Sequence, residues 1–296
     1  MKVLFMGTPD YAEIILKNLI DKYEIVGVYT QPDKPVGRKK TLTPPPVKVL
    51  AQSHNIKVFQ PKNLKQEAQN IKELNPDFIV VAAFGQILPK EILEIAPCIN
   101  LHASLLPKYR GASPIQSAIL NNDRFTGITA MKMDIGLDTG EILAYEYCEV
   151  GNKTAPELFD ELADIASKLT PYVINNYKKI LPLKQIDAIS TYSPKITKDD
   201  GKVDFENSYQ IYRKYLAFYY WPGIWTEKFK LKKIELVDTD SINEKGKILE
   251  INKDNIVVGC NKGRLKIYKI QPHSKKEMDI LSYLNGQRLK VGDNLL

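Results

Sequence analysis

The sequence predicts an α/β protein with a Rossmann-like, doubly wound and mostly parallel sheet, followed by a smaller OB-like β-barrel domain. Segments typical of strands and helices alternate through the first half of the chain, as they do in parallel sheets. Residues 78–83 form a continuous apolar run, which is typical of a strand covered on both faces. The last third changes to short β-rich runs separated by Asn, Lys and Gly, which favours a small barrel.

The elements of the first half follow in order. Strands are expected at residues 2–6, 25–29, 58–59, 78–83 and 141–148, with a central strand that begins at residue 98. Helices are expected at residues 10–19, 47–54, 64–74, 89–95 and 156–179. The first turn lacks the G-x-G-x-x-G spacing of a dinucleotide-binding fingerprint, and no phosphate-binding P-loop motif is present.

Composition divides the rest of the chain. Residues 181–204 mix Pro, Lys, Ser and Asp with little periodicity, so we expect a linker there between a catalytic domain at 1–180 and a basic OB-like domain at 205–296. The second domain is expected to begin with a helix and to continue with strands, at residues 207–218 and at 232–237, 247–251, 256–259 and 265–271. Its aromatic stretch at 218–225 is expected to pack the small core, with base stacking as the alternative.

The net charge of +7 is concentrated in the second part of the chain. Residues 1–180 hold 21 basic and 20 acidic side chains, a balance of +1, and residues 181–296 hold 21 and 15, a balance of +6. A basic appendage on a near-neutral half favours a polyanionic partner. The alternative is a solvated lysine-rich surface.

Targeting and redox features favour a cytoplasmic protein. No apolar run reaches membrane-spanning length, and the first strand is too short for the core of a signal peptide. The three cysteines are odd in number and far apart, so they predict neither a disulfide framework nor a metal site. We therefore expect a monomer that binds no membrane and no metal.

Two polar residues interrupt the apolar central strand. Asn100 and His102 are two positions apart, so an extended strand presents them on one face, near the carboxyl end where open α/β sheets bind ligands. Asp138 lies between Gly136 and Gly140, whose backbone can turn sharply. A carboxylate there could orient an imidazole or take a proton. The alternatives are a histidine that caps the core and an aspartate that stabilises a turn.

These residues also carry a resemblance. Asn100-x-His102, the SLLP run at 104–107 and the GLDTG run at 136–140 resemble the 10-formyltetrahydrofolate-dependent transformylases. The resemblance implies a formyl-transfer site made of Asn100, His102 and Asp138. It also implies a pterin-binding surface made of Phe84, Gly85, Leu88, Ser104, Leu105, Leu106 and Pro107. No side-chain nucleophile is needed, because the acceptor amine attacks the formyl group directly, through a tetrahedral oxyanion.

The long loop at 31–46 indicates the acceptor. It is rich in proline and carries four cations, namely Lys34, Arg38, Lys39 and Lys40. It resembles the insertion that binds the acceptor arm of tRNA in the members of the family that act on tRNA. We therefore expect the methionine of initiator tRNA to receive the formyl group. An amino sugar, a ribonucleotide, or water in a formyl-folate hydrolase remain alternatives, as does a flexible tether with incidental lysines.

Overall fold

The computed structural model describes residues 1–37 and 39–296, and the chain divides into two compact units. The first unit comprises Met1–Pro114, Phe125–Glu149 and Leu158–Pro194. The second unit comprises Ile115–Arg124, Val150–Glu157 and Lys195–Leu296. The segment expected as a linker, residues 181–204, is therefore divided between the two units after Pro194.

The sheet of the first unit confirms the expected mostly parallel α/β fold. Its strands are β1 (Lys2–Gly7), β2 (Glu24–Tyr29), β5 (Val58–Phe59), β6 (Phe78–Ala82), β7 (Cys98–His102), β9 (Phe125–Lys132) and β10 (Ile142–Glu149). Their order across the sheet is β10-β9-β7-β6-β1-β2-β5. The strands from β7 to β5 are parallel, whereas β9 runs antiparallel to β7 and β10 antiparallel to β9.

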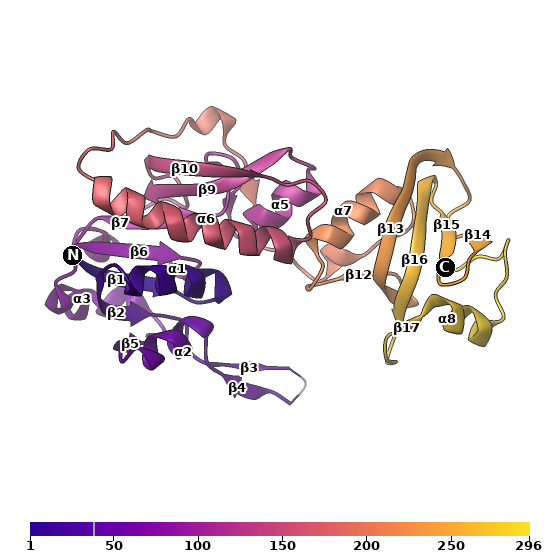
Figure 1. Ribbon diagram of the computed structural model, residues 1–296, viewed down its shortest axis with the longest axis horizontal. Helices are drawn as coiled ribbons and strands as arrows, with labels where there is room; N and C mark the ends of the chain where they lie inside the picture. Colours follow the sequence, from indigo (N-terminus) through magenta and orange to yellow (C-terminus); the bar gives the residue numbers. More distant parts are fainter. Residues whose placement is uncertain (38) are drawn as a thin grey trace. The chain divides into compact units, whose positions relative to one another are not determined.

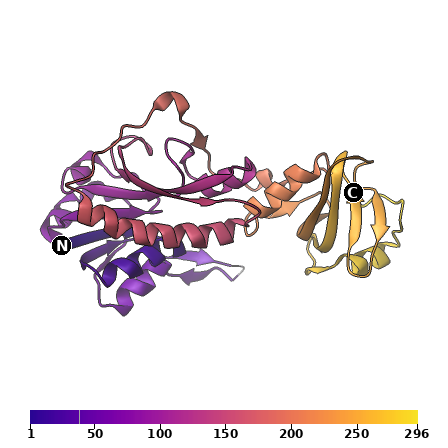
Figure 2. The same ribbon diagram turned by 45° about the horizontal axis from the view of Figure 1, so that its top comes forward.

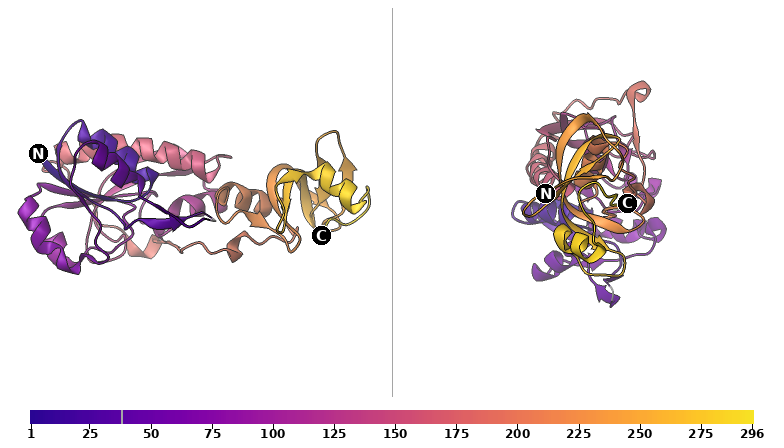
Figure 3. Two further views of the ribbon diagram at one scale, coloured as in Figure 1. Left: turned by 90° about the horizontal axis from the view of Figure 1, so that it is seen from below. Right: turned by 90° about the vertical axis from the view of Figure 1, so that its right-hand side faces the viewer.

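Helices cover both faces of this sheet (Figures 1 and 3). They are α1 (Asp10–Ile20), α2 (Pro46–Ser53), α3 (Ala68–Leu74), α4 (Lys90–Leu93) and α6 (Ala155–Asn176). Leu4 and Val81 point to one face, where they pack with Ile71 of α3. Helices α1 and α6 lie together on the other face, where the rings of Tyr11 and Phe159 meet edge to face with centroids 5.5 Å apart. Burial on both sides explains why the central strands are continuously apolar.

One edge of the sheet collects the loops that matter for function. Because β1, β2, β6 and β7 are parallel, their carboxyl ends lie at the same edge. The loops after β2, β6 and β7, which begin at residues 30, 83 and 103, leave the sheet there. This is the edge at which open α/β sheets bind ligands.

Strand β9 was not expected from the sequence, and two segments of the first unit differ from the structure that was expected for them. Residues 64–74, expected as one helix, form the 3-10 turn η1 (Leu64–Gln66) and the separate helix α3. The break falls at Glu67, whose carboxylate accepts a hydrogen bond of 3.0 Å from the hydroxyl of Tyr29. Residues 31–46, expected as a loop without regular structure, contain the hairpin β3–β4, made of β3 (Lys34–Val36) and β4 (Thr41–Thr43).

The second unit contains an antiparallel sheet, as expected. Its strands are β12 (Ile224–Trp225), β13 (Phe229–Ile242), β14 (Ile248–Ile251), β15 (Ile256–Gly259), β16 (Lys262–Pro272) and β17 (Met278–Asp279). Their order is β12-β13-β16-β15-β14, and β17 pairs with β16. The long strands β13 and β16 run side by side, in orange and yellow in Figure 2. The helices of this unit are α5 (Pro114–Leu120), α7 (Ser208–Ala217) and α8 (Ile280–Gln287), with the 3-10 turn η3 (Asp199–Gly201).

Arg213 of α7 connects two earlier chain segments to the second unit. Its side chain is 1% exposed. Its Nε donates to the carbonyl of Ile119 at 2.7 Å, and its Nη1 donates to the carbonyl of Gly151 at 3.0 Å. Burial lowers the pKa of this guanidinium, and a buried cation needs such acceptors. The second unit is therefore built from three stretches of chain rather than from the C-terminal segment alone.

Candidate active site

The polar pair of β7 lies in the interior of the sheet. Asn100 is paired with Val81 of β6 on one side and with Met131 of β9 on the other. His102 ends the strand opposite Thr129. The two side chains share one face of the strand, as their spacing predicts, at the edge of the sheet where the loops gather.

His102 is held in one tautomer when its ring is neutral. The imidazole is 7% exposed, and its Nε2 lies 2.8 Å from the carbonyl oxygen of Tyr109. A carbonyl can only accept, so Nε2 carries a proton and Nδ1 is the nitrogen that can bind another. Tyr109 has a left-handed backbone with φ +60°, which is unusual for a bulky residue. Its amide donates to the hydroxyl of Thr191 at 2.8 Å, which helps to hold that carbonyl against the ring.

Asp138 joins the pair from the loop between β9 and β10. Its Oδ1 lies 3.4 Å from Nδ2 of Asn100, and its Oδ2 lies 3.7 Å from Nδ1 of His102. The amide of Gly111 donates to Oδ2 at 2.9 Å. Asp138 also adopts a left-handed backbone, with φ +54°, which aspartate tolerates better than most residues. The structure thus brings together the three residues to which the resemblance assigned formyl transfer.

The loop after β7 is held by one hydrogen bond within it and by two to Thr129 of β9. Ser104 donates from its hydroxyl to the carbonyl of Lys108 at 2.6 Å, and Thr129 donates to the carbonyl of Ser104 at 2.6 Å. The amide of Leu106 donates to the hydroxyl of Thr129 at 3.0 Å. Ser104 and Leu106 are buried, whereas Leu105 and Pro107 are half-buried. Of this run, Leu105 and Pro107 therefore have side-chain surface left for a ligand.

In the loop after β6, the two side chains that the resemblance assigned to the pterin are buried, whereas Gly85 exposes its backbone. Phe84 and Leu88, which the resemblance assigned to the pterin, are each 2% exposed and belong to the core cluster. Gly85 is exposed and has φ +81°. Thr8 and Gln31 donate to the carbonyl of Phe84 at 3.2 and 3.1 Å. These bonds from the segments that follow β1 and β2 fix the path of the loop, so a flat ring could lie against its exposed backbone.

The hairpin β3–β4 carries exposed cations. Lys34, Lys39 and Lys40 are exposed, and Arg38, the fourth cation predicted to bind tRNA, lies outside the described residues. Just before the hairpin, the carboxylate of Asp33 contacts Nε2 of Gln60 at 2.7 Å and Nζ of Lys48 at 2.8 Å. Hydrogen bonds from Gln60 and Lys48 lower the pKa of Asp33, so the one acid of this region remains charged and is paired with Lys48.

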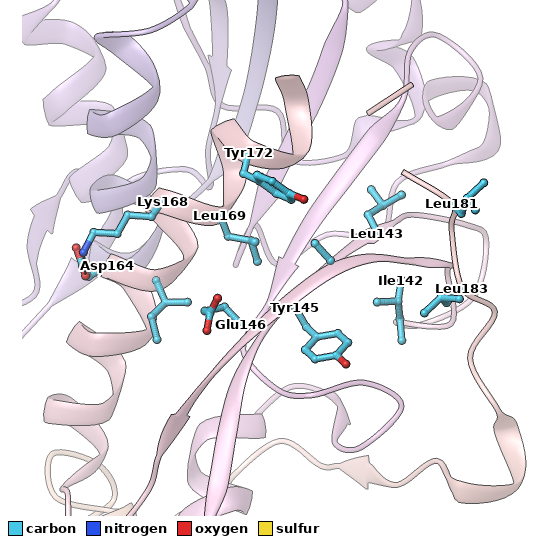
Figure 4. A pocket seen from close by; sticks show the side chains of 12 residues that line it. Ile142, Leu143, Tyr145, Glu146, Asp164, Lys168, Leu169, Tyr172, Leu181 and Leu183 are labelled. Atoms are coloured by element: carbon cyan, nitrogen blue, oxygen red, sulfur yellow. Dashed lines mark hydrogen bonds and ion pairs between the residues drawn. The ribbon is translucent and has the colours of Figure 1, made fainter. Parts of the chain in front are cut away.

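A separate apolar groove of about 630 Å³ lies between β10 and α6. Figure 4 shows Tyr145 and Glu146 of β10 on one side and Lys168 and Leu169 of α6 on the other. Leu183 contributes to its lining, but Asn100, His102 and Asp138 do not. The groove is therefore distinct from the site at the end of β7.

Two further observations concern the described residues only. Within 1–37 and 39–296, no helix is long and apolar enough to cross a bilayer. In the same residues, no group of three His, Cys, Asp or Glu side chains is arranged to hold a metal ion. Cys98, Cys148 and Cys260 are buried, and burial raises the pKa of the Cys98 thiol to about 12.

Several groups around the trio were not found from the sequence. The carbonyl of Tyr109 and the amide of Gly111 are backbone groups, and backbone groups leave no residue-type signal. Gln185 contacts the Asp138 loop from a segment that composition indicated to be a linker. Gly111, which has φ +109°, was the one residue in the sequence that pointed to these supporting groups. A glycine can mark a place where the backbone approaches another segment closely.

Comparison with known proteins defines the class of the protein. A family model described as "Formyl transferase" matches residues 1–190, and a model described as "Formyl transferase, C-terminal domain" matches residues 195–288. The chain belongs to the formyl transferase family. The solved N-formyltransferase of Helicobacter canadensis, in complex with folinic acid and dTDP-3-aminofucose, has a TM-score of 0.69 at 21% identity. That match covers 92% of this chain and 100% of the other.

Within the family, the chain groups with enzymes of one kind. It is 55% identical to the methionyl-tRNA formyltransferase of Nitratiruptor sp. over 99% of both chains.

The chain also matches HypX from Aquifex aeolicus with a TM-score of 0.69 at 15% identity. That match covers 99% of this chain but 50% of HypX, so the chain spans about half the length of that protein, and the likeness concerns the fold.

Proposed function

We propose that the protein transfers a formyl group from 10-formyltetrahydrofolate to the amino group of methionine carried by initiator tRNA, at Asn100, His102 and Asp138. The observation that carries the proposal is the convergence of these side chains. Asp138 lies 3.4 Å from Asn100 and 3.7 Å from His102, at the carboxyl end of β7. The family and the 55% identical relative support the same reaction.

Asn100 and His102 divide the work of the transfer. The amide N–H groups of Asn100 stabilise the negative oxygen of the tetrahedral state, as donors do in other acyl transfers. His102 receives the proton that the attacking amine loses, and it gives a proton to the departing nitrogen. Because Nε2 is bonded to the carbonyl of Tyr109, Nδ1 is the nitrogen that exchanges this proton.

Asp138 supports both neighbours. Its carboxylate lies 3.7 Å from Nδ1 of His102, so its negative charge lies beside the proton that the ring receives from the amine. The amide of Gly111 holds Oδ2 at 2.9 Å, which keeps the carboxylate in place while the charge on the ring changes. A water molecule between the carboxylate and the ring could also carry the proton across the 3.7 Å distance.

The exposed backbone near the trio would bind 10-formyltetrahydrofolate, the co-substrate. We place the pterin against the loop at 83–88 and the run at 104–107. The backbone at Gly85 and the half-buried Leu105 and Pro107 provide the contact surface. Phe84, Leu88, Ser104 and Leu106 shape this surface from the core side, because their side chains are buried.

Two basic parts of the chain would bind the tRNA. The hairpin β3–β4 follows β2 at the edge of the sheet that holds the trio, where its lysines could hold the acceptor end. The antiparallel sheet of the second unit would contact phosphates farther along the tRNA. We infer a cytoplasmic monomer, because charged initiator tRNA is used there and because the site is complete within one chain.

The reaction can be tested with purified protein, 10-formyltetrahydrofolate and charged initiator tRNA. Formyl-methionine on the tRNA is the expected product. Asp138→Asn and His102→Ala should each lower kcat by about a hundredfold or more, the usual contribution of an acid–base group. Asp134→Asn is the matched control. Asp134 lies in the same loop, where its Oδ1 accepts bonds from Gly136 and Thr139, a role that the amide oxygen of asparagine can fill.

The choice of acceptor separates the alternatives. Equal turnover with a dTDP-amino sugar would make the protein a small-molecule formyltransferase. Release of formate without an amine acceptor, at the rate seen with tRNA, would make it a hydrolase. Wild-type turnover in Asp138→Asn would remove the trio from the mechanism.

A further inference from the structure

Gln185 contacts the Asp138 loop at two points. Its Nε2 donates to the carbonyl of Asp138 at 2.8 Å and to the carbonyl of Gly140 at 2.8 Å. It lies in the segment at 181–194, which follows α6 and belongs to the first unit. One side chain thus binds the residue that carries the carboxylate and also the glycine two positions later.

Arg110 determines which way the amide of Gln185 faces. Its Nε and Nη2 approach Oε1 of Gln185 at 3.0 and 2.9 Å. A guanidinium can only donate, and carbonyls can only accept. The oxygen of Gln185 therefore has to face Arg110 and its nitrogen has to face the loop, so all four contacts agree on one orientation.

Side-chain packing next to Asp138 does little to hold the loop in place. Ile135 and Leu137, the large apolar side chains nearest to Asp138 in the loop, are 71% and 51% exposed, so core packing does not fix their positions. Asp134 bonds Gly136 and Thr139 within the loop and shapes it without attaching it to the sheet. Hydrogen bonds from neighbouring segments are therefore the main restraint on where the carboxylate of Asp138 lies.

These restraints form a closed ring of contacts. The strand β8 (Arg110–Gly111) provides the amide of Gly111 to the carboxylate of Asp138, and it provides the side chain of Arg110 to Gln185. Gln185 then returns to the backbone carbonyl of Asp138. The short strand β11 (Tyr192–Ser193) pairs with β8. The segment that carries Gln185 is therefore attached to the strand that carries Arg110 and Gly111.

We propose that Gln185, oriented by Arg110, is a positioning residue for formyl transfer that sets the carboxylate of Asp138 against His102. The inference rests on the proposed role of Asp138. Its physical basis is that errors of about 1 Å in the placement of a catalytic group can cost about a hundredfold in rate. Gln185 touches neither substrate in this account, so it should affect kcat through Asp138 and leave folate binding unchanged.

Gln185→Glu removes both N–H donors but keeps an acceptor for Arg110. We expect kcat for Met-tRNA to fall by about ten- to a hundredfold, with the KM for 10-formyltetrahydrofolate changed by less than about twofold. Gln185→Met has nearly the same shape and no hydrogen bonds, and it should show the same loss. Gln69→Glu in α3, where Gln69 is exposed, is the matched control and should retain wild-type kcat.

A double-mutant cycle distinguishes positioning from a general structural role. If Gln185 acts through Asp138, Gln185→Glu should cause no further loss in a protein that already carries Asp138→Asn. Single-turnover assays with excess enzyme make the residual rate measurable. The thermal midpoint of each variant shows whether the protein is still folded, and Gln185→Met provides the answer if Gln185→Glu does not fold.

Two results would overturn the inference. One is a kcat within twofold of wild type in both Gln185 variants. The other is an equal loss in the wild-type and Asp138→Asn backgrounds, because the two residues would then act independently. If Asp138→Asn itself retains full kcat, the proposed mechanism fails, and this outcome differs from the failure of Gln185 alone.

Discussion

At the scale of single residues, Asn100 is well suited to substitution, because Asn100→Asp changes its chemistry but hardly its shape. The variant loses two N–H donors and places a second carboxylate where Nδ2 lies 3.4 Å from Asp138. We expect kcat to fall by about 10²- to 10³-fold, as when an oxyanion donor is removed. The KM for the folate should change by less than about threefold, because the donor acts in the transition state.

Steady-state kinetics with Met-tRNA would measure both constants. Asn63→Asp provides the control, since the exposed Asn63 accepts a bond from the amide of Lys65, which an aspartate also accepts. A loss confined to KM, with kcat unchanged, would contradict a role for Asn100 in stabilising the oxyanion.

The sequence predicts the side chains of the site that lie on β7 and in the loop between β9 and β10. Asn100 and His102 are adjacent on one face because a strand has a period of two, and Asp138 lies between glycines. Tyr109 acts through its carbonyl, whose direction depends on a left-handed φ. Gln185 acts from 47 positions away from Asp138. No local pattern encodes such a contact, so the supporting groups could be found only in the structure.

At the scale of elements, the hairpin β3–β4 gives the next prediction. Lys39 and Lys40 form no ion pair within the described residues, so they are available to phosphates. Replacing both by alanine should weaken tRNA binding and flatten its salt dependence. Each lost contact to a single-stranded acceptor end should reduce the slope of log K against log salt by about 0.7.

Binding measured across a salt series would test this prediction. The control replaces two exposed lysines of the first unit elsewhere, Lys17 and Lys22, by alanine and leaves the net charge of the two variants equal. If both variants show the same slope, net charge alone accounts for the effect and the hairpin has no particular role.

Asp238 gives a prediction of stability for the pairing of β13 with β16. Its carboxylate accepts from the amide and hydroxyl of Ser241 at 3.0 and 2.7 Å and pairs with Arg264 of β16. Burial favours a raised pKa for this carboxyl, but the hydrogen bonds outweigh burial and hold the pKa far below its usual range. A depressed folded-state pKa stabilises the fold above the unfolded pKa of about 3.9, and this stabilisation is lost as the pH falls below it.

Asp238→Asn should therefore lower the free energy of unfolding by about 1–3 kcal/mol at pH 7. The difference from wild type should shrink as the pH is lowered from about 4 toward 2. Denaturant unfolding at a series of pH values would measure it, with the exposed neighbour Asp240→Asn as control. A difference that is independent of pH would show that the charge of Asp238 is not the cause.

The hairpin and the break before α3 show which elements the sequence does not predict. Every residue of β3 and β4 is exposed, and each strand has three residues, which are too few to show the alternation over four or more residues that indicates a strand. Residues 64–74 have helical composition throughout, and the interruption at Glu67 coincides with its tertiary hydrogen bond to Tyr29. Strands buried on both faces, such as β6, were predicted nearly to the residue because their apolar runs are long.

At the scale of the whole molecule, the division of the chain is less simple than its composition indicates. The jump in basic charge after residue 180 predicts a second part, but residues 115–124 and 150–157 also belong to it. Arg213 holds the carbonyls of Ile119 and Gly151 in these segments. A chain shortened to its first 194 residues would leave those segments without their partner. Changes of charge in the intact protein therefore test the role of the second unit more cleanly than truncation.

The outer face of the sheet in the second unit is the place for that test. Lys230 of β13 and Lys266 of β16 alternate with the buried residues Leu231 and Leu265, so they point away from the core. Within the described residues neither lysine forms an ion pair, whereas Lys232 and Lys269 of the same strands both lie 3.9 Å from Glu277. Lys230 and Lys266 are the cations of these strands that we expect to contact tRNA phosphates.

Replacing Lys230 and Lys266 by alanine should raise the Kd for initiator tRNA and lower the salt slope by about 1 to 2, since each contact to a duplex phosphate contributes about 0.9. The kcat at saturating tRNA should stay within about twofold of wild type, because neither residue belongs to the trio and uniform binding affects KM rather than kcat. Lys253→Ala, at an exposed position between β14 and β15, controls for the loss of a surface lysine. An unchanged slope, or a fall in kcat without a change in affinity, would mean that this face does not bind the tRNA and that the basic charge of the second unit serves another purpose.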